Sequence, residues 1–249
     1  MLDCPAMRLY GQYCPVARAA EILGDRWTVL ILRELLAGIG HFNELERGLP
    51  GVSRSLLAER LDRLARTGVL ERRAVGRGKG VEYRLTPAGR ALQPVIDAMG
   101  GWGARFAFGE PRPSELDPIV LLWWMRRRVA FDRLPRERLV VGFDFPGARP
   151  PRSWLVLRSF GEASICLKHP GFEEDVVATA DIAAFYRVWL GRETLAAALR
   201  RGAVRLDGTP ADLRGFPHWF TWSPMAGAVR AAAALPRGHG AAGHHAALL

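Results

Sequence analysis

Cysteine, targeting signals and long apolar runs are scarce or absent in this chain. Its three cysteines, Cys4, Cys14 and Cys166, lack the spacing of metal ligands or of a disulfide framework. The N-terminus has no apolar signal core, and the longest uninterrupted apolar run, Ile119–Met125, is far too short to span a bilayer. We therefore expect a cytoplasmic protein with reduced thiols, no metal and no membrane association.

Motifs of catalysis are also missing. The chain has no Gly-x-Ser-x-Gly elbow and no Cys/His pair in a recognisable setting. The glycine-rich stretch 76–80 is followed by a strand-like segment, whereas a nucleotide-binding loop requires a helix there. His239, His244 and His245 fall in a Gly/Ala/His-rich tail, 236–249, that we expect to be disordered. The sequence predicts neither an enzyme nor a cofactor.

What the chain does have is apolar residues and positive charge. An apolar fraction of 49% suffices for packed cores, and 249 residues suit two medium domains. The net charge of +10 favours a polyanionic partner. Residues 54–90 hold 10 basic and 4 acidic side chains. The basicity of residues 111–249 matches no motif, and since arginine far outnumbers lysine, composition bias accounts for it.

Residues 41–68 have the pattern of two helices joined by a tight turn. Phe42, Leu45 and Leu49 form an apolar stripe at helical spacing, and Pro50-Gly51 ends that helix. Ser53 is a suitable N-cap for the next helix, which Gly68 ends. The predicted buried face of that second helix is Leu57, Leu61, Leu64 and Ala65. The predicted outward face is Ser55, Leu56, Glu59, Arg63 and Arg66, with Arg60 on the flank.

A basic hairpin follows the second helix. Residues 69–73 and 81–85 are strand-like, and the glycine-rich tip between them carries Arg77 and Lys79. Such a tip suits a phosphate backbone or a minor groove, and an outward helix end with Ser and Arg suits a major groove. Taken alone, the second helix is equally compatible with a solvated amphipathic helix without a partner; the hairpin favours a winged helix-turn-helix. The predicted DNA-binding residues are Ser53, Arg54, Ser55, Leu56, Arg60, Arg63, Arg77 and Lys79.

An ordered series of motifs over residues 10–107 resembles the HxlR family of bacterial transcriptional regulators. The series comprises YCPVA (13–17), LGDRWTVLILREL (23–35), FNEL (42–45), LPGVS (49–53), Leu56-Leu57, Arg60-Leu61, Leu64 and LTPAG (85–89). The resemblance implies a homodimer joined by its N- and C-terminal helices. It also implies that Ser53–Thr67 and the wing bind a pseudo-palindromic operator in double-stranded DNA.

Cys14 suggests an alternative function. It stands just before Pro15 and the first helix, and a thiol at a helix N-terminus can be reactive. Some HxlR relatives sense oxidants or electrophiles through a cysteine at this place. The structural alternative is a small residue that fills the dimer interface.

The second half of the chain has a different pattern. Residues 109–115 have the composition of a linker, and Asp117-Pro118 begins an apolar helix. Strand-like segments at 139–145, 153–158, 163–168 and 176–179 precede helices at 181–190 and 193–201 and a strand at 203–206. Antiparallel strands followed by helices predict an α+β domain.

This order of elements is similar to the sterol carrier protein fold. The resemblance is based mainly on residues 175–222, with Asp181, Phe185, WLG (189–191), Gly202, Gly208 and Phe216, Trp219 and Phe220. It implies an apolar cavity between a sheet and its helices, without catalytic residues. The predicted ligand-binding residues are Leu121, Trp124, Met125, Phe185 and Trp189. For any individual tryptophan, core packing is the competing explanation.

Together these patterns predict an α+β protein with a winged helix-turn-helix domain at 1–108, a linker at 109–115, a sterol-carrier-like domain at 116–235 and a tail at 236–249. The predicted function is a DNA-binding regulator whose operator affinity an apolar small molecule modulates. Two alternatives stay open. One is a redox regulator that acts through Cys14, and the other is a lipid carrier that uses the winged helix mainly to dimerise.

Overall fold

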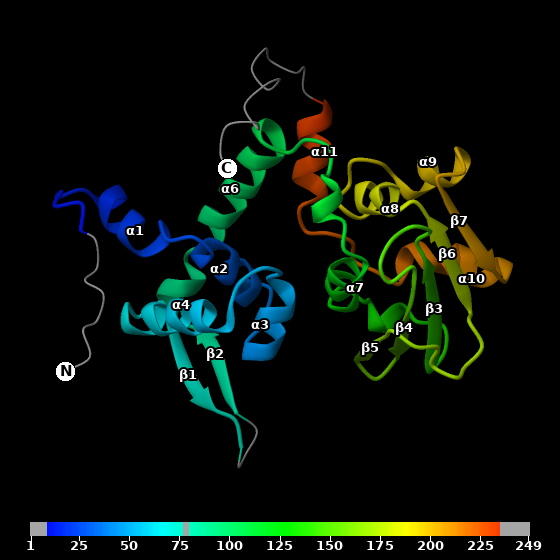
Figure 1. The fold of residues 1–249 in the computed structure, drawn as a ribbon, viewed down its shortest axis with the longest axis horizontal. Coiled ribbons are helices and arrows are strands. Elements are labelled where there is room, and N and C mark those ends of the chain that lie inside the picture. The colour runs from blue at the N-terminus through cyan, green and yellow to red at the C-terminus, as the bar shows by residue number, and fades with distance from the viewer. Residues whose placement is uncertain (1–8, 77–79, 235–249) are drawn as a thin grey trace. The chain divides into compact units, whose positions relative to one another are not determined.

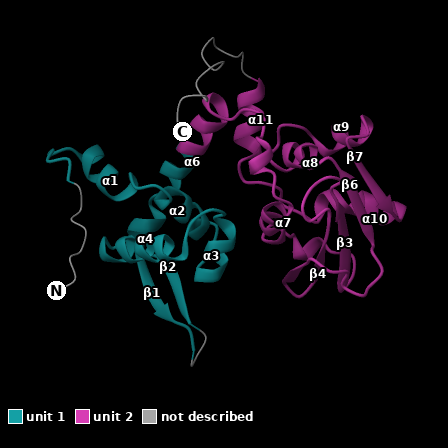
Figure 2. Ribbon diagram, in the orientation of Figure 1, with its two compact units in different colours: residues 1–98 teal, residues 99–249 magenta. Residues whose placement is uncertain are grey.

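Two compact units make up the computed structural model, residues 1–98 and residues 99–249 (Figures 1 and 2). The structure describes residues 9–76 and 80–234. The division falls within the helix α6 (Gln93–Phe106), so that the predicted linker, 109–115, belongs to the second unit. The predicted tail, 236–249, lies outside the described residues.

The first unit is a set of short helices with one β-hairpin. Its elements are α1 (Pro15–Leu23), α2 (Thr28–Leu36), α3 (Phe42–Gly48), α4 (Arg54–Arg66), β1 (Leu70–Ala74), β2 (Val81–Leu85), α5 (Pro87–Arg90) and the first part of α6. β1 and β2 are antiparallel, with Leu70 opposite Leu85. The core contains Ile31 and Leu32 of α2, Leu45 of α3, and Leu57, Leu61 and Leu64 of α4. The predicted two helices, turn and hairpin are confirmed.

The second unit is an α+β domain around one mixed sheet. Its elements are α7 (Pro118–Arg126), β3 (Arg138–Asp144), β4 (Arg152–Arg158), β5 (Glu162–Cys166), β6 (Val176–Ala180), α8 (Ile182–Trp189), α9 (Leu195–Arg200), β7 (Val204–Gly208), α10 (Pro210–Gly215) and α11 (Ala226–Ala234). The strand order is β5-β4-β3-β6-β7. β3 and β6 are parallel, whereas the other three neighbouring pairs are antiparallel. The predicted antiparallel-rich sheet is therefore confirmed, but the sequence analysis did not predict the parallel pair. The sterol carrier resemblance stays a prediction.

One face of this sheet packs against α7 and α8. Phe143 and Phe145 point from the β3 side toward Phe185 of α8, with ring centroids 5.7 and 5.6 Å from that residue and T-shaped geometry. All three rings are fully buried. Because aromatic rings bury large apolar areas and favour this geometry, they stabilise the contact between helix and sheet.

The opposite face of the sheet is covered by the segment between β5 and β6. Val140, Trp154 and Phe172 form a small apolar cluster there. The Trp154 Nε1–H donates to Glu174 Oε1 at 2.6 Å. Gly142 permits this arrangement, since a Cβ at that position would lie 2.9 Å from the Glu174 carboxylate. The sheet is thus packed on both sides.

The last part of the second unit closes its core. The backbone N–H of Ala130 donates to the Trp219 carbonyl at 2.8 Å, and that of Thr221 donates to the Arg128 carbonyl at 2.7 Å. Phe216, Trp219 and Phe220 are buried in the main cluster. These aromatic residues follow α10, a helix that the sequence analysis did not predict. Residues 219–221, near the end of the unit, therefore pair with residues 128–130, which follow α7.

Several arginines of the second unit hold its loops in place. The Arg126 Nε donates to the Ala163 carbonyl at 2.5 Å, and the Arg128 Nε donates to the Trp222 carbonyl at 3.1 Å. Arg136 forms ion pairs with Asp175 and with the buried Asp212. Three of the basic residues that match no motif thus have a structural use. Among the described residues, no helix combines the length and apolar character needed to cross a bilayer.

Candidate nucleic-acid interface and ligand pocket

The N-terminal end of α4 is capped and exposed. Ser53 has an extended backbone, with φ −76° and ψ 151°, and its hydroxyl accepts the Leu56 N–H at 3.2 Å. This confirms the predicted N-cap, which satisfies a backbone donor that the helix itself leaves unpaired. Ser53, Arg54 and Ser55 are exposed and Leu56 is half-buried. The first turn of the helix therefore presents two hydroxyls and a guanidinium to solvent.

Arg54 is held in place by α3. Its guanidinium forms an ion pair with Glu46 and donates to Asn43 Oδ1 at 3.3 Å. It also lies over the Phe42 ring, 4.8 Å from the centroid. The Arg54 side chain is nevertheless 62% exposed. Since exposed ion pairs contribute little net free energy, a phosphate or a base edge can compete for this guanidinium.

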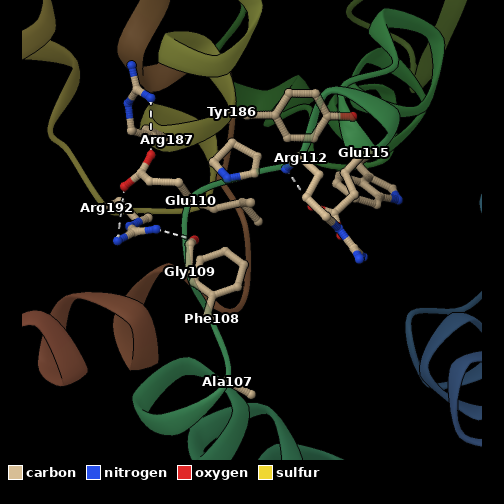
Figure 3. Close-up of a pocket in the computed structure, with 12 residues that line it drawn as sticks. Ala107, Phe108, Gly109, Glu110, Arg112, Glu115, Tyr186, Arg187 and Arg192 are labelled. Atoms are coloured by element: carbon tan, nitrogen blue, oxygen red, sulfur yellow. Dashed lines mark hydrogen bonds and ion pairs between the residues drawn. The ribbon is translucent and has the colours of Figure 1, made fainter. Parts of the chain in front are cut away.

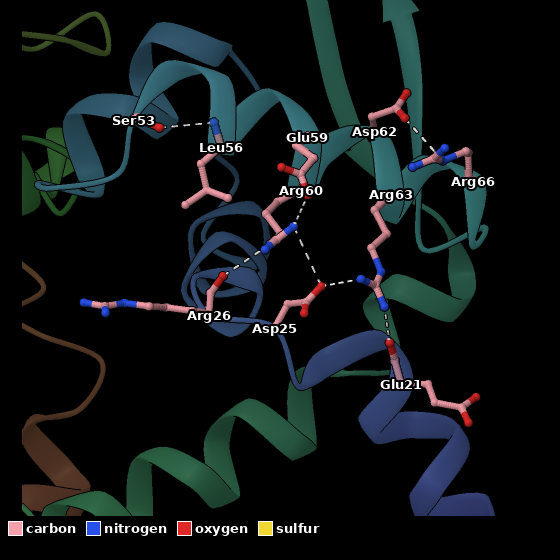
Figure 4. A network of polar contacts seen from close by, with 10 residues as sticks. All are labelled: Glu21, Asp25, Arg26, Ser53, Leu56, Glu59, Arg60, Asp62, Arg63 and Arg66. Atoms are coloured by element: carbon pink, nitrogen blue, oxygen red, sulfur yellow. Dashed lines mark hydrogen bonds and ion pairs between the residues drawn. The ribbon is translucent and has the colours of Figure 1, made fainter. Parts of the chain in front are cut away.

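Arg60 and Arg63 are directed toward the turn between α1 and α2 (Figure 4). The Arg63 guanidinium pairs with Asp25 and donates through Nη2 to the Glu21 carbonyl at 2.5 Å. The Arg60 Nε donates weakly to the Arg26 carbonyl at 3.4 Å, and its Nη1 lies 2.5 Å from Glu59 Oε1.

These placements correct the predicted orientation of Arg63. The side chains of Arg60 and Arg63 are only 14% and 23% exposed. Helical periodicity placed Arg63 on the outward face, but the pairing with Asp25 turns it inward. Both arginines tie α4 to the first two helices, and a direct DNA contact by either requires it to leave these partners.

The hairpin of β1 and β2 carries a second set of exposed cations. Arg72 and Arg73 on β1 and Arg84 on β2 are exposed. Arg73 pairs with Glu71 at 2.8 Å, and Arg84 pairs with Glu82 at the same distance. The predicted wing-tip residues, Arg77 and Lys79, lie outside the described residues. The sequence analysis did not name the strand arginines, although the alternation of the strands would have placed two of them on one face.

Cys14 is the N-cap residue of α1. Its backbone is extended, its carbonyl accepts the Arg18 N–H at 3.0 Å, and its thiol is free and half-buried. The neighbouring Tyr13 and Val16 are exposed.

The predicted ligand-binding residues divide into two groups. Leu121, Met125, Phe185 and Trp189 belong to the packed core of the second unit, where none is more than 1% exposed. Their side chains fill the space that a cavity between sheet and helices would occupy. Trp124 is only partly buried and lines a pocket on the other side of α7.

This pocket has a volume of about 240 Å³ and lies within the second unit (Figure 3). Its walls come from residues 107–115, from α7 and α8, and from the turn after α8. The residues that line it are Ala107, Phe108, Gly109, Glu110, Pro111, Arg112, Glu115, Trp124, Tyr186, Arg187, Leu190 and Arg192. Among the described residues, no group of His, Cys, Asp and Glu side chains has a metal-binding arrangement.

Comparisons with known proteins find relatives of the N-terminal part of the chain, which includes the first unit. Residues 22–110 match the HxlR-like helix-turn-helix family. An uncharacterized HTH-type transcriptional regulator of Mycobacterium tuberculosis, Rv3095, is 42% identical over 107 residues, which cover 43% of this chain and 65% of Rv3095. The crystal structure of quinone-bound YodB from Bacillus subtilis is similar, with 37% identity, a TM-score of 0.34, and coverage of 37% of this chain and 99% of YodB.

A further relative is covered almost completely. YvaP of Bacillus subtilis, an uncharacterized HTH-type transcriptional regulator, is 36% identical over 109 residues, which cover 43% of this chain and 97% of YvaP. The chain spans only 65% of the length of the mycobacterial relative, whereas it includes nearly all of YvaP. Through its first unit, the chain belongs to the HxlR-like helix-turn-helix family.

Proposed function

We propose that this protein is a transcriptional regulator that binds a pseudo-palindromic operator as a homodimer. One observation supports this most strongly: the capped, exposed first turn of α4, followed by a basic hairpin, in a chain of the HxlR-like family. In helix-turn-helix proteins the N-terminal residues of the second helix meet base edges, while a wing reaches the phosphate backbone.

Different residues have different parts in this proposal. Ser53, Arg54, Ser55 and Leu56 meet the DNA directly, because they form the exposed first turn of α4. Arg77 and Lys79 contact phosphates from the wing tip, together with the exposed arginines of β1 and β2. Arg60 and Arg63 act indirectly, since they fix the orientation of α4 against the α1–α2 turn.

The test is a titration of labelled DNA from the promoter region beside the gene, at several salt concentrations. We expect Arg54→Ala to weaken binding by about 1–3 kcal/mol if it reads a base, or to lower the salt slope by about 1 if it contacts a phosphate. Arg66→Ala, at the other end of the same helix, is the matched control and should have a smaller effect. Equal affinities for Arg54→Ala and the unchanged protein would rule out the proposed reading end of α4.

Dimerisation is supported by an exposed apolar stripe on α6. Val95, Met99, Trp102 and Phe106 repeat at intervals of four, three and four residues, and each is at least 40% exposed. This spacing is typical of a helix seam that another helix covers. We expect Trp102→Glu to give monomers in analytical ultracentrifugation, whereas Asp97→Ala on the same helix should leave dimers. Monomers of the unchanged protein at micromolar concentration would contradict the proposed dimer.

The second unit provides the ligand-dependent part of the proposal. Because four of the five predicted ligand-binding residues are packed in the core, the pocket at Trp124 is the better location for an effector. The proposed mechanism is a population shift in which an effector favours one spacing of the two α4 helices of the dimer. An effector that binds the protein but leaves operator affinity unchanged would exclude the ligand-dependent mechanism and leave the proposed operator binding intact.

Regulation through Cys14 is a second candidate. A free, half-buried thiol at the N-cap of a helix is accessible to an oxidant or electrophile, and a helix N-terminus favours the reactive thiolate. Under this alternative, Cys14→Ser abolishes the response of DNA binding to peroxide or a quinone and preserves binding itself. Cys166→Ser is the control. An unchanged response in Cys14→Ser would exclude this thiol as the sensor.

A further inference from the structure

The pocket of the second unit has mostly apolar walls. Trp124 and Tyr186 form one side, with ring centroids 6.1 Å apart and T-shaped geometry. Phe108, Pro111 and Leu190 contribute further apolar surface. The Tyr186 hydroxyl donates to the Asp117 carbonyl at 2.9 Å, and burial raises the pKa of this phenol above its usual value. Because the hydroxyl is already engaged, Tyr186 offers the pocket its ring.

The rim of the pocket has two arginines that share one carboxylate. The Arg187 Nη1 lies 3.3 Å from Glu110 Oε2, and the Arg192 Nη2 lies 3.2 Å from Glu110 Oε1. Arg192 also donates to the Gly109 carbonyl. The arginine side chains are 29% and 20% exposed, whereas Glu110 is 65% exposed. Two partly buried cations therefore share a single carboxylate that water can reach, and one positive charge is left in excess.

The remaining charges near the pocket are already paired. Arg112 binds Glu115 through two nitrogens at 2.6 and 3.0 Å. Glu193, which follows Arg192, binds Arg201 through both of its oxygens at 2.6 Å. The lining residues thus carry three arginines and two glutamates, a net charge of +1. This balance favours a monoanion over a neutral molecule or a doubly charged phosphate.

We propose that this pocket binds a small aromatic carboxylate, with its ring between Trp124, Tyr186 and Phe108 and its carboxylate on Arg187 and Arg192. The ligand carboxylate takes the place of Glu110, and the paired guanidiniums match its planar geometry. A volume of about 240 Å³ suits one or two rings, because pockets for larger drug-like ligands usually exceed roughly 300 Å³. The role of this site in regulation rests on the proposed function, for which it names the effector class.

Release of Glu110 has a direct consequence for residues 107–115. This segment continues directly from α6 and is held to α8 and the following turn through Glu110 and the Gly109 carbonyl. A ligand that displaces Glu110 removes two of these contacts. The site therefore connects ligand binding to the segment that follows the proposed dimerisation helix.

The test measures binding to the whole 249-residue chain by isothermal titration calorimetry with 1-naphthoate and benzoate as probes. Two comparison compounds separate charge from ring: 1-naphthamide is neutral, and hexanoate is an aliphatic acid. We expect at least one aromatic acid to bind, and the amide and hexanoate to bind at least tenfold more weakly. Equal affinity of acid and amide, equal affinity of hexanoate, or no binding of either aromatic acid would overturn the proposal.

Variants make the test specific to the rim. Arg187→Gln should weaken binding at least tenfold, whereas Glu110→Gln should strengthen it severalfold because it removes the competing carboxylate. Glu110 is exposed, so this variant is expected to fold, and circular dichroism verifies that. Arg205→Gln, on β7, is the control and should bind like the unchanged protein. Weaker binding by Glu110→Gln would contradict the exchange of carboxylates.

These titrations and the operator titration, repeated with and without 1-naphthoate, together distinguish this proposal from the proposed function. Binding of 1-naphthoate without any change in operator affinity would support the ligand site and exclude its role in regulation. If the protein binds the operator but neither aromatic acid, the proposed DNA-binding function stands and the proposed ligand site is excluded.

Discussion

The arginines of the proposed DNA surface and those in the interior of the second unit are paired in different ways. At the first turn of α4 and on the hairpin, Arg54 and Arg73 are exposed and pair with nearby surface carboxylates. In the second unit, Arg128 binds a backbone carbonyl, and Arg136 pairs with the buried Asp212. Exposed pairs are exchangeable, whereas a pair with a buried carboxylate is costly to break. Local placement, more than net charge, therefore identifies a surface for a polyanion.

The largest expected effect concerns the aromatic core of the second unit. We expect Phe185→Ala to lower the free energy of unfolding of the second unit by about 3–5 kcal/mol, because it leaves a cavity against Phe143 and Phe145. Denaturant unfolding measures the loss. Operator binding per folded molecule should stay close to that of the unchanged protein. A small loss of stability would indicate that this part of the core holds a ligand-sized space.

Arg63 differs from Arg54 on the same helix because it is largely buried and pairs with Asp25, so its replacement tests the comparison within α4. We expect Arg63→Ala to reduce the stability of that unit by about 1–3 kcal/mol, because Asp25 and the Glu21 carbonyl lose their donor. Arg54→Ala should cost about 1 kcal/mol or less, since its ion pair is exposed. Thermal unfolding of both variants measures the difference. Equal losses of stability in the two variants would show that the buried pairing of Arg63 contributes no more than the exposed pairing of Arg54.

Two strand arginines with similar local pairing sharpen the comparison between the units. Arg73 on β1 pairs with Glu71 at 2.8 Å, and Arg205 on β7 pairs with Asp207 at 3.1 Å. We expect Arg73→Ala to reduce the salt slope of DNA binding by about 1, because one phosphate contact is lost. Arg205→Ala should leave the slope unchanged. The opposite result would place the DNA surface on the second unit.

The smallest effect is a dependence of stability on pH. The hydrogen bond from Arg136 holds the pKa of Asp212 below its usual value. Because the pKa is lowered in the folded state, this pair stabilises the second unit fully above the unfolded value of about 3.9, and the contribution is lost as the pH falls through the folded value. We expect Asp212→Asn to show a smaller drop in Tm below about pH 4. An identical drop in both proteins would assign the effect to other groups.

Local signals predicted much of the fold. Ser53 and Asp117 both cap helices as expected, since each side chain accepts backbone N–H groups of the first turn. Gly68 follows the end of α4 with a φ of 72°, a conformation that glycine adopts without strain. These features depend on residues within a few positions of one another, and sequence patterns describe such short ranges well.

Features that depend on distant residues were not predicted. The inward direction of Arg63 depends on Asp25, which lies 38 positions away. The parallel pairing of β3 with β6 depends on the route of the chain, which strand alternation does not reveal. Residues 107–115 and α8 both line the pocket at Trp124, so a segment expected to be a simple linker is part of its wall.

The pairing of residues 128–130 with 219–221 has a consequence for synthesis on the ribosome. The first unit has all of its core residues once Ile96 has emerged, and it can fold while translation continues. The second unit lacks Phe216, Trp219 and Phe220 until nearly its whole length has been made. A premature stop before residue 216 would therefore leave a folded first unit joined to an incomplete second unit, whose exposed apolar residues would favour aggregation.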